Sequence, residues 1–186
     1  MLDNVAVPVS FDQVSPDAPS SPGIIEVDPN LRVEISPSTI EALQLASRLA
    51  AQGHVRLVHA TPDVHRFSMY SGPEGMWLPA DTTQQLDRAA KGRSQLVLQE
   101  LAARYLRGAE VELVIAPGTP VTVVLDAVAS HRTDAIIMAA SGRGPFRRAL
   151  GGSTANKLIR RSPCPVIVVP GPGVPAASNS AKTAAP

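Results

Sequence analysis

The chain has 186 residues, 44% of them hydrophobic, so it can bury one substantial core and is about the size of a single domain. Its net charge of +1 argues against a general polyanion binder, and its aromatic residues are scattered rather than interleaved with basic ones, which argues against nucleic-acid binding. The absence of a long apolar run and of a signal-peptide pattern at the first residues leads us to expect a cytoplasmic protein with no membrane partner.

The first 35 residues change character twice. Residues 4–9 are rich in β-forming side chains, and Pro8 within them marks a strand end or a bulge. Residues 13–23 are rich in Pro, Ser and Asp. Residues 24–27 and 31–35 then alternate apolar and polar side chains on either side of a turn, which predicts two short strands.

A helix is predicted to begin next, and two capping patterns compete for its start. Ser36 can be the N-cap with Pro37 at the first helical position, or Ser38 can form a capping box with Glu41. Gly53 ends the apolar periodicity and therefore the helix.

Residues 55–60 predict a buried strand that contains a histidine. We expect His59 to pack or to hydrogen-bond in the core, because no other histidine has metal-ligand spacing to it. Residues 61–80 form a long loop with several apolar side chains. These either close over a ligand or contact a partner, or they fold back onto the core.

The next stretch, residues 81–108, predicts a long helix capped by Asp81 with Gln84 in the box position. Its apolar side chains predict a buried face made of Leu86, Ala89, Leu96, Leu101 and Tyr105.

A strand over residues 110–115 and a helix from Thr119–Pro120 to about His131 precede another buried strand, residues 135–138. This alternation indicates an α/β protein, with a parallel sheet, helices on both faces and right-handed crossovers. In such sheets a ligand binds beyond the carboxyl ends of the strands, where the strand order reverses.

The loop from residue 139 to residue 154, AASGRGPFRRALGGST, is the strongest functional signal. Its glycines allow close approach of the backbone to a phosphate, and Gly152-Ser153-Thr154 opens a helix whose first N–H groups lack intrahelical partners. Six Lys or Arg residues and no acidic residue lie between residues 141 and 162. The pattern favours phosphate binding over the alternative, a mobile surface connection with ordinary capping residues.

The spacing of this loop resembles that of the universal stress protein family, whose nucleotide-binding members carry G-x2-G-x9-G-[S/T] after the fourth strand. Gly142, nine residues, and then Gly152-Ser153 match that pattern, and the ending SPCPVIVV at residues 162–169 matches the family's last strand. The chain departs from the family at two positions. The first glycine of the loop is Ala139 here, and the aspartate that ends the first strand is Ser10.

The resemblance implies a five-stranded parallel sheet of order 3-2-1-4-5 with helices on both faces, as in adenine nucleotide α-hydrolase-like proteins. Residues 1–170 would form one domain and residues 171–186 a disordered tail. Family members pass quickly from the first strand to the first helix, so residues 11–35 would be an insertion with a hairpin, lying over the nucleotide site as a lid or plug. Alternatively, residues 31–35 are themselves the first strand.

The resemblance also implies binding of ATP or a related adenine nucleotide and a regulatory or protective role in the stress response. Mg²⁺ would accompany the phosphates, although no clear carboxylate ligand is present. No residue resembles a general base beside a γ-phosphate, so we expect no catalytic residues and at most slow hydrolysis. The residues expected around the nucleotide are Val9, Ser10 and Ala60 beside adenosine, Met138 and Ala139 on the base and ribose side, and Gly142, Gly152, Ser153 and Thr154 at the phosphates. Independently of the resemblance, the charge and position of Arg143 or Arg147 predict that one of them adds positive charge beside the phosphates.

A second interpretation remains open, in which the chain has lost nucleotide binding and acts as a dimeric interaction module. Ala139 and Ser10 support it, whereas the intact spacing from Gly142 to Ser153 opposes it. A homodimer is expected in either case. Residues 166–169 are apolar on both faces and would expose pairing groups at the sheet edge unless a second copy covered them.

Overall fold

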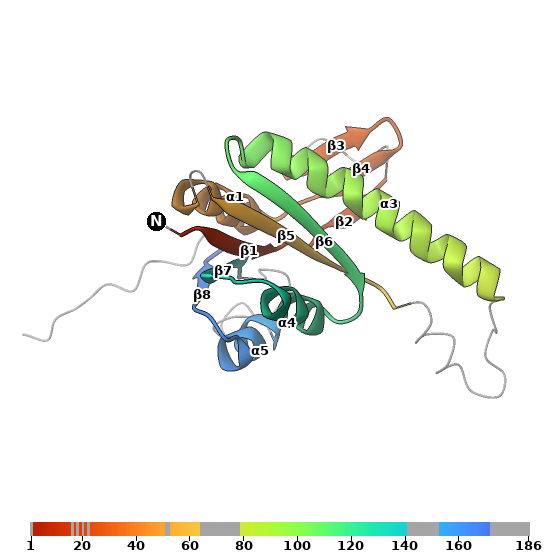
Figure 1. Ribbon diagram of the computed structural model, residues 1–186. Helices are drawn as coiled ribbons and strands as arrows, with labels where there is room; N and C mark the ends of the chain where they lie inside the picture. Colours follow the sequence, from red (N-terminus) through yellow and green to blue (C-terminus); the bar gives the residue numbers. More distant parts are fainter. Residues whose placement is uncertain are drawn as a thin grey trace, which may run out of the picture.

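The computed structural model describes residues 2–15, 17, 19, 21, 23–50, 53–63, 79–140 and 153–171. Its main sheet is five-stranded and parallel, in the spatial order β6-β5-β1-β7-β8 (Figure 1). The strands are β1 Asn4–Pro8, β5 His54–Thr61, β6 Glu110–Pro117, β7 Ala135–Ala139 and β8 Val166–Val169. Numbered within this sheet the order is 3-2-1-4-5, which confirms the predicted fold.

Helices cover both faces of this sheet, as Figure 1 shows. One face packs against α1 (Pro37–Leu49) and α3 (Ala80–Tyr105), and the other against α4 (Pro120–Ser130) and α5 (Ser153–Arg161). Alternate side chains along each strand enter two apolar cores, one on each face. None of the described helices is both long and apolar enough to cross a bilayer.

A second, antiparallel sheet lies between β1 and α1 in the chain. It has the order β2-β4-β3, with β2 at Asp12–Val14, β3 at Ile24–Asp28 and β4 at Leu31–Glu34. The strands β3 and β4 form the hairpin expected from the alternating pattern. The alternative in which residues 31–35 are the first strand of the main sheet is wrong, because β1 occupies that place.

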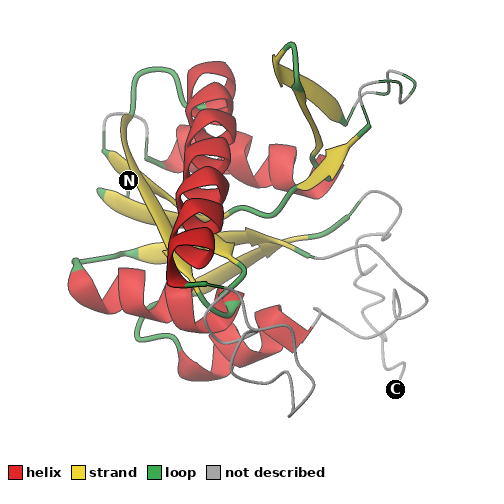
Figure 2. Ribbon diagram, turned by 90° about the vertical axis from the view of Figure 1, so that its right-hand side faces the viewer, coloured by secondary structure: helices red, strands yellow, loops and turns green. Residues whose placement is uncertain are grey.

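The hairpin extends the α1/α3 side of the molecule. Ile25, Leu31 and Val33 are buried in the same apolar core as these helices, and β3 packs on α3. Figure 2 shows this small sheet beside α1 and α3. The described strands of residues 11–35 therefore add to one layer of the fold, and Phe11, just before β2, stacks on His59 of β5.

The start of α1 follows the first of the two capping patterns. Ser36 is the N-cap, its Oγ accepts a hydrogen bond from the Thr39 backbone N–H at 3.2 Å, and Pro37 occupies the first helical position. Ser38 lies inside the helix, so a capping box from Ser38 is wrong.

The predicted start and buried face of α3 need correction. The helix begins at Ala80 after Pro79, without a side-chain cap, so Asp81 lies in its first turn. Leu86 and Leu96 are each 45% exposed, whereas Leu101 is buried. The face that meets the sheet is set by Val97, Leu98 and Leu101, and the first turns of α3 extend past the sheet (Figure 1).

Candidate functional site

Strands β1 and β7 part before they end. The strand β1 stays in register with β5 along its whole length, from Asn4 opposite His54 to Pro8 opposite Val58. Its pairing with β7 covers only Val5 opposite Ala135 and Ala6 opposite Ile136. The order of strands reverses between β1 and β7, and their separation toward the carboxyl ends is the feature that positions ligands in open parallel sheets.

The chain leaving β1 remains attached to β5. The backbone N–H of Val9 donates to the carbonyl of Val58 at 2.9 Å, and the Val9 side chain is buried with 4% exposure. Ser10, the next residue, is exposed. Of these two predicted site residues, Val9 is part of the α1/α3 core and Ser10 is at the surface.

The side chain of His59 joins the ends of β1 and β5. Its Nδ1 lies 2.9 Å from the carbonyl oxygen of Val9, and its ring stacks on Phe11 with a centroid distance of 4.4 Å and an interplanar angle of 15°. Burial lowers the pKa of His59 below its ordinary value of 6.5, against the opposing effect of the hydrogen bond to Val9. The expectation that His59 packs and hydrogen-bonds in the core is confirmed.

At the end of β7, the entrance to the predicted phosphate loop is held from two sides. Ala139 is the last residue of the strand and is in register with Val169 of β8. The backbone N–H of Ala140 donates to the carbonyl of Val169 at 2.7 Å, and the carbonyl of Ala140 accepts from Ser38 Oγ at 3.3 Å. Met138, just before, is 6% exposed in the α4/α5 core.

Ser38 belongs to a cluster of hydroxyl groups at the start of α1. Ser36 Oγ lies 3.1 Å from Ser38 Oγ and 2.8 Å from Thr39 Oγ1, and both Ser38 and Thr39 are buried with 2% exposure. These hydrogen bonds satisfy the buried hydroxyl groups. The bond from Ser38 to Ala140 also fixes the N-terminal end of α1 against the chain that leaves β7.

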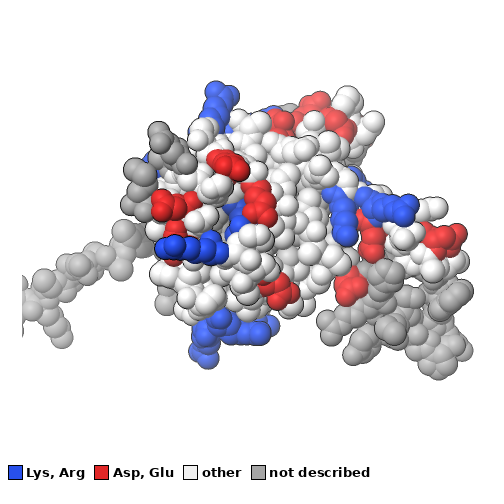
Figure 3. Space-filling view, in the orientation of Figure 1, with Lys and Arg blue, Asp and Glu red and all other residues white. Residues whose placement is uncertain are grey.

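Four of the predicted site residues, Gly142, Arg143, Arg147 and Gly152, lie outside the described residues. Ser153 begins α5, and Thr154 in its first turn is half-buried. Lys and Arg side chains gather over α5 at the lower end of the molecule in Figure 3. They include Lys157, Arg160 and Arg161, all exposed.

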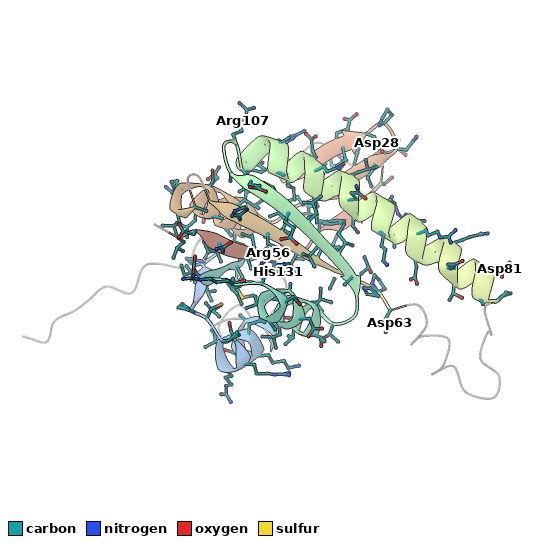
Figure 4. The ribbon with its side chains drawn as sticks, in the orientation of Figure 1. Asp28, Arg56, Asp63, Asp81, Arg107 and His131 are labelled. Atoms are coloured by element: carbon teal, nitrogen blue, oxygen red, sulfur yellow. The ribbon has the colours of Figure 1, made fainter. Side chains whose placement is uncertain are left out.

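The structure therefore places the described candidates at one edge of the sheet. Val9, Ser10, Ala60, Met138 and Ala139 all come from the carboxyl ends of neighbouring strands. Figure 4 marks this edge by Asp63, which lies just past the end of β5.

Sequence reasoning missed three residues that contact this edge. The sequence assigned neither Phe11 nor Ser38 to the site, and it predicted that His59 packs or hydrogen-bonds in the core. The sequence could have indicated two of them, because Phe11 follows Ser10 and His59 precedes Ala60, and both Ser10 and Ala60 are predicted site residues. In the described part of the chain there is no group of three or more His, Cys, Asp or Glu side chains that could hold a metal ion.

The comparisons with known proteins agree with the fold. The model of the universal stress protein family matches residues 33–170, well over half of the chain, so the chain belongs to this family. It is 30% identical over 95 residues to Universal stress protein Rv2005c of Mycobacterium tuberculosis. That match covers 51% of this chain and 30% of the relative, so the chain corresponds to only part of the relative's length.

Two solved structures show the same fold. The universal stress protein UspA from Lactobacillus plantarum is 19% identical, with a TM-score of 0.57, covering 89% of this chain and 96% of its own. The hypothetical protein MJ0577 is 17% identical, with a TM-score of 0.61, covering 90% of this chain and 95% of its own. At these identities the likeness concerns the fold alone.

Proposed function

We propose that this universal stress protein binds ATP or a related adenine nucleotide at the carboxyl edge of its sheet and acts as a regulatory or protective factor in the stress response. The observation that carries the proposal is the parting of β1 and β7 directly in front of the loop that begins at Ala140. A ligand can reach both strand ends and that loop from this position.

The phosphates are assigned to the loop between β7 and α5. Its spacing from Gly142 to Gly152-Ser153 is that of the nucleotide-binding members. The half-buried Thr154 lies in the first turn of α5, where backbone N–H groups favour an anion. The basic residues of the loop and of α5 supply positive charge, with Arg143 as the assigned phosphate neighbour.

The adenosine is assigned to the other strand ends, Val9 and Ser10 after β1 and Ala60 on β5, with Met138 and Ala139 toward the ribose. Ala60 and Ala139 are half-buried, and Ser10 exposes a hydroxyl group, whereas Val9 and Met138 are buried beneath them. Bound Mg²⁺ would take its ligands from the phosphates and water, which is how this ion is usually held. The proposed compartment is the cytoplasm, which supplies the nucleotide.

A second candidate function is an interaction module without nucleotide. It is favoured by two specific positions: Ala139 places a methyl group where the family has glycine, and Ser10 lacks the carboxylate that would accept hydrogen bonds strongly.

Whether it binds nucleotide or acts as an interaction module, the protein forms a homodimer through β8 in our proposal. In the described structure β8 pairs on one side only, and Val166, Ile167 and Val168 are half-buried. A monomer in analytical ultracentrifugation at micromolar concentration would contradict the dimer.

Calorimetric titration of the nucleotide-stripped protein with Mg-ATP separates the two functions. Nucleotide binding predicts saturation near one ATP per chain, whereas the interaction module predicts no heat and no thermal stabilisation at millimolar ATP.

Three variants then test the site. Gly142→Val should abolish binding without unfolding the protein, because the side chain crowds the backbone beside the phosphate. Ala139→Gly and Ser10→Asp should each strengthen binding by restoring the family residue. If affinity stays the same in all three variants, the assigned site is wrong.

A further inference from the structure

The strand β6 forms an open edge of the main sheet. It is in continuous parallel register with β5, from Glu110 opposite His54 to Pro117 opposite Thr61, and no strand lies on its other side in the described part of the chain. Figure 1 looks onto this edge, with α3 above β6 and α4 below it. The strand has eight residues, whereas β8 at the opposite edge has four. The longer of the two open edges is therefore β6.

The direction of the backbone groups of β6 follows from its bonds to β5. The N–H of Glu110 donates to the carbonyl of Gly53 at 3.1 Å, and the N–H of Gly118 donates to the carbonyl of Thr61 at 3.0 Å. Successive residues of a strand direct their backbone groups to opposite sides, so the even-numbered residues between these two bonds also face β5. The backbone groups that point away from the sheet therefore belong to three residues, Val111, Leu113 and Ile115.

Both faces of β6 are apolar beyond Glu112, and both are only partly covered. Its half-buried side chains are Val111, Leu113 and Ile115 against the α1/α3 core, and Val114 and Ala116 against the α4/α5 core. Figure 3 shows a surface without charged side chains over this part of the strand. A long apolar edge strand whose outer N–H and C=O groups lack a partner strand is a template for pairing with another strand.

The two charged side chains of β6 both contact side chains of β5. Glu112 Oε2 lies 2.7 Å from Arg56 Nε, and Glu110 Oε2 lies 3.3 Å from His54 Nδ1. Charges at an edge oppose pairing when they meet charges of the same sign, because like charges directly opposite each other destabilise a sheet. The register of a partner strand therefore decides whether the two glutamates oppose it.

A second copy of β6 fits this edge in one antiparallel register. Residues whose backbone groups point outward must lie opposite each other. With a two-fold axis at Leu113, Val111 lies opposite Ile115, each facing pair exchanges two backbone hydrogen bonds, and Glu112 lies opposite the apolar Val114. The strand is therefore self-complementary about Leu113.

The neighbouring registers are each disfavoured for a physical reason. An axis at residue 111 or 112 would place glutamates directly opposite each other. An axis at residue 114 or 115 would bring Pro117 into the ladder, and proline has no N–H to donate.

We propose that two copies of this chain pair through β6, antiparallel and with the two-fold axis at Leu113, so that their main sheets become one continuous sheet. Facing residues of an antiparallel pair lie on the same face, so the partly covered apolar row of each copy is covered by the same row of the other. This edge is opposite to β8. The contact is therefore separate from the dimer proposed above, and it does not depend on nucleotide binding.

Amide hydrogen exchange of the full chain, followed by NMR at several protein concentrations, tests the pairing without a mutation. The amides of Val111, Leu113 and Ile115 should exchange at least about tenfold more slowly near millimolar than near micromolar concentration, because only the second copy protects them. The amides of Glu112 and Val114, which face β5 within one copy, are the internal control. Fast exchange of the three outer amides at every concentration would refute the pairing, as would their protection in a sample that sediments as a monomer.

Charge exchange at Leu113 tests the register. In Leu113→Lys alone, or Leu113→Glu alone, like charges meet at the axis, so association measured by sedimentation velocity should weaken at least about tenfold. An equimolar mixture places a lysine opposite a glutamate and should recover association. The matched control is Leu113→Met, which keeps an apolar side chain and should associate as the wild type does.

Thermal melts followed by circular dichroism establish that the charged variants are folded, which we expect because a long side chain at this half-buried edge position can reach water. Association of both single variants equal to that of the wild type would show that another surface carries it and would refute the pairing through β6. Folded variants whose mixture fails to recover association would overturn the axis at Leu113.

Discussion

Two side-chain pairs join β5 to β6, and they differ in burial and in charge, because a histidine is charged only when it is protonated. Arg56 Nε lies 2.7 Å from Glu112 Oε2, with side-chain exposures of 8% and 48%. Two residues earlier, His54 Nδ1 lies 3.3 Å from Glu110 Oε2, with exposures of 56% and 78%. Figure 4 shows Arg56 on the side of the sheet where α4 lies. The two pairs therefore compare a nearly buried arginine with an exposed histidine within one strand pair.

Removing either partner of the inner pair should have unequal effects. Glu112→Leu leaves a nearly buried guanidinium that still donates to Thr133 Oγ1 at 3.4 Å, and should cost about 2–3 kcal/mol of unfolding free energy. Arg56→Met keeps an apolar stem in place and leaves a half-exposed carboxylate that water can solvate, so it should cost about 1 kcal/mol or less.

Urea denaturation of the wild type, both single variants and the double variant gives the coupling energy of the pair. We expect about 1.5–3 kcal/mol for Arg56 with Glu112, and about 0–0.5 kcal/mol for His54 with Glu110. Equal coupling in the two cycles would refute the stronger coupling assigned to the nearly buried arginine, and a larger cost for Arg56→Met than for Glu112→Leu would refute the role assigned to its burial.

Three further predictions concern stability. Two backbone N–H groups at the start of β1 donate to the carboxylate of Asp134 and hold its pKa below the ordinary value of 3.8, so its stabilising contribution is complete above that pH and is lost on acidification below it. The stability difference between wild type and Asp134→Ala should thus shrink between pH 5 and pH 3 in urea titrations; a constant difference would contradict the assignment. Gly53→Ala should lower stability by about 2 kcal/mol, because its Cβ would lie 2.5 Å from the carbonyl oxygen of Asp3, and an unchanged melting temperature would show that the backbone yields there. Leu98→Ala should cost about 2–5 kcal/mol, whereas Leu86→Ala, at a side chain 45% exposed, should change stability by less than about 0.5 kcal/mol; similar losses would refute the corrected face of α3.

The sequence by itself determined the order and type of the main elements. Alternating apolar runs and helical periodicity, punctuated by Pro and Gly, identify all five strands of the main sheet, because these patterns depend on neighbours close along the chain. The strand order came from the family resemblance of the loop and the last strand, and the structure has that order. The hairpin over β3 and β4 was also visible as alternation around a turn.

The tertiary structure alone decided which apolar side chains are buried and which polar atoms meet at the site. Leu86 and Leu96 fit a helical stripe in the sequence, but the first turns of α3 extend past the sheet, and the helix packs through Val97, Leu98 and Leu101 instead. The stacking of Phe11 on His59 joins residues that are 48 positions apart, and the bond from Ser38 to Ala140 joins residues 102 positions apart. Such contacts depend on how β1, β5, β7 and α1 are placed in three dimensions. Local sequence patterns do not show which residues that are far apart along the chain come into contact. The loop after β7 was predicted from its spacing along the chain, whereas the contacts of His59 with Val9 and Phe11 are visible only in the folded strand ends.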